Sequence, residues 1–134
     1  MVRLEVAALY VGANILILLA LAFMVVRARQ THKIVLGDGG NEAALRAIRA
    51  HANAAEYIPA GLVGLVLLAL LDPAAPLWLL HAGGATLTIG RILHGIGLNT
   101  SALNFGRMGG MMLTILSYLL IGGGLIYAGL AQQL

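Results

Sequence analysis

The sequence predicts an all-α integral membrane protein, a bundle of four helices, and two observations lead to this prediction. Of the 134 residues, 60% are hydrophobic and only 10% are charged, whereas soluble domains are about 45–50% apolar and about 25% charged. A water-soluble globule could not cover its surface with so few charges, but a bundle surrounded by lipid has no such requirement. The second observation is that apolar residues gather in four spans, at residues 6–26, 54–71, 77–98 and 108–130.

Each span approaches or exceeds the length needed to cross a membrane. Roughly 20 helical residues, at about 1.5 Å each, match a hydrocarbon core of about 30 Å. Arginines follow the first span at once, and no small-residue cleavage site stands out, so it is interpreted as a retained helix and not as a signal peptide. The whole chain, residues 1–134, is expected to form one membrane domain. Its helices are predicted at residues 5–28, 41–71, 75–98 and 104–131.

Glycine, proline and asparagine mark the predicted helix ends. Residues 37–40 form a glycine-rich turn cluster, and Asn41 suits the N-cap of the second helix. Pro59 removes one backbone hydrogen bond from that helix, so a kink is expected there. Short loops are expected at residues 72–76 and 99–101.

Charge and composition limit the location and the function. Lys and Arg gather in the first connection and at the start of the fourth helix. Loops rich in these residues face the cytoplasm, so both termini are expected outside, although Arg3 opposes this weakly. The absence of cysteine excludes a disulfide framework, a thiolate metal site and a cysteine nucleophile. No basic stripe with interleaved aromatic residues points to nucleic-acid binding.

Ionisable side chains within membrane spans are functional candidates, because a charge at the bilayer centre costs about 2.5–3.5 kcal/mol. On the second helix, Arg49, Asn53, Glu56 and Tyr57 fall on one arc of roughly 100°, given about 100° per residue. Arg46 falls on the same arc. This stripe predicts a polar site, with the alternative that Arg49 and Glu56 merely neutralise each other.

Two further clusters lie on the third and fourth helices. Arg91 and His94 share one face, with the alternative that Arg91 pairs with Glu56 to hold the bundle together. Arg107 begins the fourth helix, where a cation is unfavourable, so it is interpreted as a topology signal or as an anion-binding group. Arg27 ends the first helix on the same side. Together these residues predict a cation-lined anion site between the helices.

Three stretches resemble one family. The pattern R-x-x-x-N-x-x-E, followed by tyrosine and a proline, occupies residues 49–59 and resembles the signature of the MAPEG family, the membrane-associated proteins in eicosanoid and glutathione metabolism. Residues 90–94 resemble the third-helix motif of its prostaglandin E synthase branch, and residues 104–107 resemble the start of its fourth helix. The resemblance covers essentially the whole chain, and the loop pattern looks most like the small bacterial members.

The resemblance implies a homotrimer in a bacterial inner membrane, with glutathione bound between adjacent subunits in the cytoplasmic half. It implies a microsomal-type glutathione S-transferase or peroxidase, acting on lipophilic electrophiles that enter from the lipid bilayer. Arg107 matches the arginine that stabilises the glutathione thiolate. The positions that match glutathione-binding residues are Arg27, Arg49, Asn53, Glu56, Tyr57, Arg91 and His94.

Two positions depart from the family pattern. Leu98 and Met111 stand where eukaryotic members carry tyrosines, which argues against specialised eicosanoid synthesis. A non-catalytic protein that binds glutathione or another anion is therefore an alternative. A small four-helix drug–proton antiporter is a further alternative, but such transporters need a buried carboxylate in the first helix. That helix carries Asn14, and the sole embedded acid is Glu56.

Overall fold

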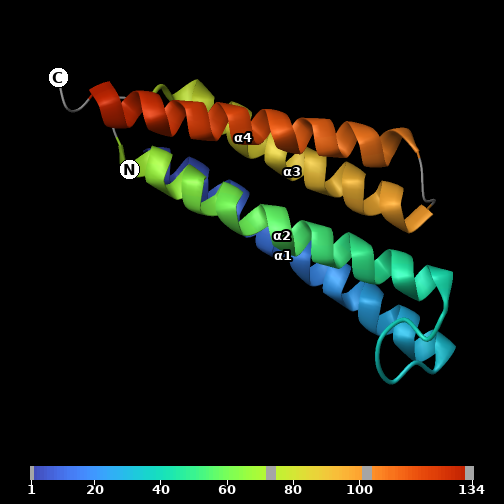
Figure 1. The fold of residues 1–134 in the computed structure, drawn as a ribbon. Helices are drawn as coiled ribbons and strands as arrows, with labels where there is room; N and C mark the ends of the chain where they lie inside the picture. The colour runs from blue at the N-terminus through green and yellow to red at the C-terminus, as the bar shows by residue number, and fades with distance from the viewer. Residues whose placement is uncertain (1, 72–74, 101–103, 132–134) are drawn as a thin grey trace.

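The computed structural model describes residues 2–71, 75–100 and 104–131, and these form an all-α bundle (Figure 1). Successive helices run in opposite directions. α1 begins and α4 ends at one end of the bundle, whereas α1 and α3 end at the other. The helices are α1 (Val2–His32), α2 (Glu42–Leu70), α3 (Leu77–Thr100) and α4 (Phe105–Ala131).

The first helix extends further than predicted, to His32 instead of residue 28. Basic side chains do not end a helix, because cations in the last turn interact favourably with the helix dipole. Arg29 and His32 occupy that turn. The chain leaves the helix at Lys33, whose φ is 54°.

The predicted glycine turn and N-cap are both confirmed. Gly37, Gly39 and Gly40 have φ values of 69°, 59° and 71°, a region that glycine adopts without steric cost. The Asn41 side-chain oxygen then accepts a hydrogen bond of 3.0 Å from the backbone nitrogen of Ala44, which caps α2. The helix continues through Pro59 to Leu70.

The remaining predicted loops fall partly outside the described residues. α3 continues to Thr100, beyond its predicted end at residue 98. Of the loop expected at residues 99–101, the first two therefore belong to the helix, and residue 101 lies outside the described part of the chain. Residues 72–74 of the loop expected at 72–76 also lie outside the described part of the chain.

The helices α1, α2 and α4 are long and apolar enough to cross a membrane. α3 is not among these helices, and polar side chains, namely His81, Arg91 and His94, interrupt its apolar sequence. It packs against each of the other three helices. Arg91 and His94 are buried, so these two side chains face the interior of the bundle, whereas His81 is exposed.

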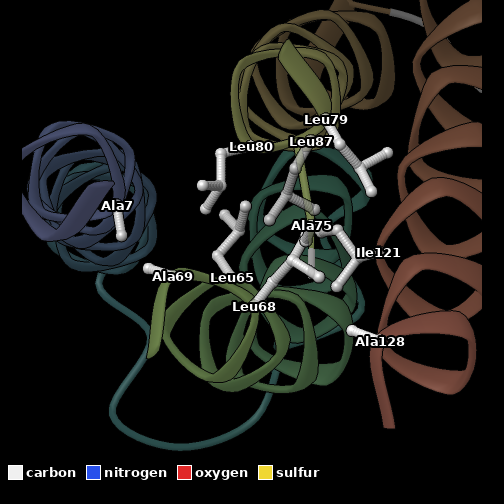
Figure 2. Packing of buried hydrophobic residues seen from close by; sticks show 10 residues of the cluster. All are labelled: Ala7, Leu65, Leu68, Ala69, Ala75, Leu79, Leu80, Leu87, Ile121 and Ala128. Atoms are coloured by element: carbon white, nitrogen blue, oxygen red, sulfur yellow. The ribbon is translucent and has the colours of Figure 1, made fainter. Parts of the chain in front are cut away.

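The main hydrophobic core lies toward the end of the bundle at which α1 begins and α4 ends. Leucines from α2 and α3 meet Ile121 of α4 there, and small alanines let the helices approach (Figure 2). A second cluster lies toward the other end and packs α1 against α2 and α3. Its buried members are Leu21, Ala50, Ala54, Ile58 and Leu98.

Glycines bring α3 and α4 close together near the second cluster. A Cβ added to Gly110 would collide with the backbone nitrogen of His94 and the carbonyl oxygen of Gly90. A Cβ on Gly97 would likewise collide with the backbone nitrogen of Arg107. Small residues permit such close contact between membrane helices. The contact places the end of α3 directly against the first turns of α4.

Candidate functional site

A cavity of about 520 Å³ opens between α2, α3 and α4, toward the end of the bundle at which α1 and α3 end. Its volume lies within the range of about 300–1,000 Å³ that is usual for small-molecule sites. Its wall combines basic and amide side chains with apolar ones, and none of the described lining residues is a carboxylate. The lining residues are Leu45, Arg46, Arg49, Asn53, His94, Leu98, Arg107, Met108 and Met111.

The first turn of α4 positions Arg107. The side-chain oxygen of Asn104 accepts a hydrogen bond of 2.8 Å from the backbone nitrogen of Arg107 and so satisfies one of the free donors of the helix start. His94 Nδ1 lies 3.0 Å from the carbonyl oxygen of Arg107. Because a carbonyl only accepts hydrogen bonds, Nδ1 carries the proton in this contact, and Nε2 of the neutral ring is an acceptor.

Arg91 is buried at the junction of three helices, with 1% of its surface exposed. Its Nη1 donates a hydrogen bond of 2.8 Å to Asn53 Oδ1 on α2, and its Nη2 donates one of 2.6 Å to Thr114 Oγ1 on α4. The Tyr57 ring covers the guanidinium, with 5.3 Å between Cζ and the ring centroid. That distance is within the range of a cation–π interaction. Arg91 therefore joins α2 and α4 through α3.

The alternative of an Arg91–Glu56 ion pair is wrong. Within the described parts of the chain, Glu56 forms an ion pair with neither Arg91 nor Arg49, and its side chain is exposed. Arg91 Nε has no hydrogen-bond partner in those parts. A buried cation without a carboxylate partner is costly, so the surroundings of Arg91 favour a nearby anion.

The residues of the polar arc of α2 lie in different surroundings. Asn53, near the middle of the arc, lines the cavity, as do Arg46 and the more exposed Arg49 on either side of it. Glu56, at one edge of the arc, is outside the cavity wall. Tyr57, at the other edge, turns to Arg91, and its carbonyl oxygen accepts a hydrogen bond of 2.5 Å from Tyr118.

One chain thus brings four of the predicted site residues onto a single cavity wall, and these are Arg49, Asn53, His94 and Arg107. Arg91 and Tyr57 lie directly behind Asn53. Arg27 is exposed on α1, which does not contribute to the described cavity wall. A role for Arg27 would require an adjacent subunit and stays a prediction.

Some residues of the site were not among the predicted ones. Arg46 lines the cavity, and its place on the polar arc was the signal that could have identified it. Thr114 is fully buried, donates a hydrogen bond of 2.9 Å to the Gly110 carbonyl and accepts one from Arg91. A lone threonine in an apolar helix gives no such signal, because its partner lies on another helix.

Comparison with known proteins agrees with this architecture. A profile of the MAPEG family matches residues 7–127. Inner membrane protein YecN of Escherichia coli strain K12 is 36% identical over 105 residues, which cover 78% of this chain and 78% of the relative. The protein of the same name from Escherichia coli O6:H1 matches to the same extent. Together with the three apolar helices, this similarity places the chain in the bacterial inner membrane. The chain belongs to the MAPEG family.

Proposed function

We propose that this protein is a glutathione-dependent membrane transferase or peroxidase that acts on hydrophobic electrophiles. The observation that supports this best is the composition of the cavity wall. Arg46, Arg49 and Arg107 share it with Asn53 and His94, and the described wall contains no carboxylate. Glutathione carries two carboxylates, and charge-assisted hydrogen bonds from arginine to carboxylate are among the strong ones. Family membership supports the same ligand.

Arg107 is proposed to hold the glutathione sulfur as a thiolate. A free thiol has a pKa of about 8.5, so only a few per cent is ionised near neutral pH. A cation within reach lowers the pKa of such a group by about 1–3. Arginine suits this role because it keeps its own charge throughout the reaction. The thiolate is the nucleophile, so its population sets the rate of attack.

The electrophile would be lipophilic. Leu98, Met108 and Met111 form an apolar part of the same wall, and Met108 is exposed on the outer side of α4. With a chlorinated nitrobenzene, the thiolate sulfur forms a bond to the ring carbon and the carbon–chlorine bond breaks. Chloride leaves with the electron pair, and the thiol proton passes to water.

Purified protein in detergent, mixed with glutathione and a chlorinated nitrobenzene, tests the proposal. We expect conjugation above the uncatalysed rate, and a loss of at least about tenfold in Arg107→Ala, since tenfold corresponds to about 1.4 kcal/mol. Arg29→Ala is the matched control. Arg29 lies at the same end of the bundle but bonds to the Gly37 carbonyl and is outside the cavity wall. The absence of turnover with several electrophiles would reject catalysis.

A specific observation supports a second candidate function, namely binding of glutathione or another anion without catalysis. Leu98 and Met111 both lie on the cavity wall, so apolar side chains occupy the two positions where family tyrosines would offer hydroxyl groups. Isothermal titration with glutathione separates the candidates. Binding without turnover favours this second function, and failure to bind any glutathione-like anion rejects both.

The active assembly is proposed to be a homotrimer. Arg27 and Glu56 are exposed and lie outside the cavity wall of their own chain, which supports a site that an adjacent subunit completes. Mixing an Arg27→Ala chain with an Arg107→Ala chain tests this. Partial recovery of activity in the mixed assembly is expected if one subunit's Arg27 acts in another subunit's site. Mass measurement of the detergent-solubilised protein should give three copies.

A further inference from the structure

The orientation of the Asn53 amide follows from its contact with Arg91. A guanidinium group has only donors. The Asn53 atom that lies 2.8 Å from Arg91 Nη1 must therefore be the carbonyl oxygen. The amide nitrogen occupies the other branch of the side chain. It has no hydrogen-bond partner among the described residues, and Asn53 lines the cavity.

The second terminal nitrogen of Arg91, Nη2, also has an acceptor whose orientation is determined. The Thr114 hydroxyl donates its proton to the Gly110 carbonyl at 2.9 Å, which leaves its oxygen as the acceptor for Arg91 Nη2 at 2.6 Å. Arg91 is thus held between two oxygen acceptors on different helices, and its Nη2 also lies 3.8 Å from the sulfur of Met111. The Tyr57 ring covers the guanidinium. Its burial keeps it away from the cavity, since only 1% of its surface is exposed and it is absent from the described cavity wall.

We propose that Arg91 is a positioning residue, which fixes the amide of Asn53 so that its N–H donors face the cavity and select an anionic ligand. This inference rests on the proposed function, but it assigns Arg91 a different part from the direct contact with glutathione that the family resemblance implies. Without Arg91, the amide could rotate and present its oxygen. An oxygen on a wall that otherwise carries cations would repel a carboxylate and remove one donor.

Asn53→Asp keeps the acceptor that faces Arg91 but replaces the amide donor that faces the cavity, so it tests the two contacts separately. One carboxylate oxygen still accepts from Arg91, now as an ion pair, so the fold and the thermal stability should be retained. The other oxygen replaces the amide donor that faces the cavity. We expect glutathione to bind about tenfold more weakly or worse, because a donor to a charged group is replaced by a like charge. Wild-type affinity in this variant, or a variant that no longer folds, would overturn the proposal.

A double-mutant cycle separates positioning from direct contact. Arg91→Lys keeps the charge but loses the two-pronged geometry, and Asn53→Ala removes the amide. If Arg91 acts through Asn53, each single change weakens glutathione binding, and the double variant binds no more weakly than Asn53→Ala alone. Independent sites give additive effects. Additivity would show that Arg91 contacts the ligand itself and would overturn the proposal.

Thr114→Val is the matched control, because it removes the hydrogen bond between Arg91 and Thr114 and leaves the Asn53 contact in place. It should lower thermal stability, while glutathione affinity changes by less than about threefold. A loss of affinity as large as that of Asn53→Asp would mean that general loosening, and not the amide orientation, controls binding.

Inorganic phosphate distinguishes this inference from the proposed function. If the wild type binds phosphate but not glutathione, the proposed function fails. The comparison of wild type with Asn53→Asp then uses phosphate as the probe, and we expect weaker binding in the variant. If the wild type binds glutathione and Asn53→Asp binds it equally well, the proposed function stands and the positioning role of Arg91 falls. If wild-type protein binds neither anion, both are rejected.

Discussion

His94 Nδ1 lies 3.0 Å from the carbonyl oxygen of Arg107, so the last part of α3 is tied to the first turn of α4. The backbone contact between Gly110 and His94 lets the two helices approach closely enough for this bond. The same bond sets the tautomer of His94 and fixes the turn from which the Arg107 side chain extends. The stability of this junction and the placement of the proposed thiolate-binding arginine therefore depend on one another.

Replacement of His94 should show this dependence. In His94→Asn the amide nitrogen can take the place of Nδ1 and keep the bond, whereas His94→Phe removes it. We expect the phenylalanine variant to lose about 1 kcal/mol of unfolding free energy and more of its glutathione-transferase activity than the asparagine variant. Chemical denaturation in detergent and the conjugation assay measure the two effects. Equal stability and activity of the two variants would contradict the structural role of the bond.

The α3–α4 contact can be tested with neighbouring glycines. Gly110→Ala places a Cβ against the backbone of His94, and overpacking of this kind costs about 1–3 kcal/mol. Gly109→Ala is the control, since a Cβ there meets no atom within 4 Å in the described structure. Thermal unfolding followed by circular dichroism should give a lower midpoint for Gly110→Ala alone. A similar loss in both variants would argue that helix content, and not the close contact, is responsible.

The charge of Arg107 should govern the pH dependence of conjugation. A cation favours the thiolate, so the pKa of bound glutathione should lie below the value of about 8.5 for a free thiol. Activity then rises with pH through this lowered pKa. In Arg107→Gln the rise should move to higher pH by about 1–3, whereas Arg107→Lys should keep part of the effect. Rate–pH profiles that superimpose for all three proteins would exclude a role of this charge in thiolate formation.

The two missing tyrosines can be reintroduced one at a time. Met111 is half-buried on the cavity wall, so Met111→Tyr should fold and could add one hydroxyl contact to glutathione. One hydrogen bond of about 1 kcal/mol corresponds to roughly fivefold tighter binding. Leu98 instead packs with Leu21 and Ile58, so Leu98→Tyr should destabilise the bundle by about 1–3 kcal/mol. Titration calorimetry and thermal unfolding measure the two outcomes, and tighter binding with full stability in Leu98→Tyr would contradict this packing argument.

Local features of the fold were predictable from the sequence. The cap at Asn41 and the glycine turn before it depend on a few adjacent residues and agree with the structure. The end of α1 was less predictable, because arginines near a helix end are compatible with both helix and loop. The polar arc of α2 was identified, but the fate of Glu56 was not, since a helix wheel shows which residues share a face and not how the helix is rotated.

The sequence by itself determined that this protein is a membrane bundle with a basic end, because apolar length and the distribution of charge are properties of single segments. The tertiary structure decided which polar groups meet. Arg91 binds Asn53 and Thr114, and not Glu56, because the rotation of α2 and the close contact of α3 with α4 bring those two acceptors within reach. These are contacts between residues distant in sequence. Their geometry depends on packing across the whole bundle, which no single segment encodes.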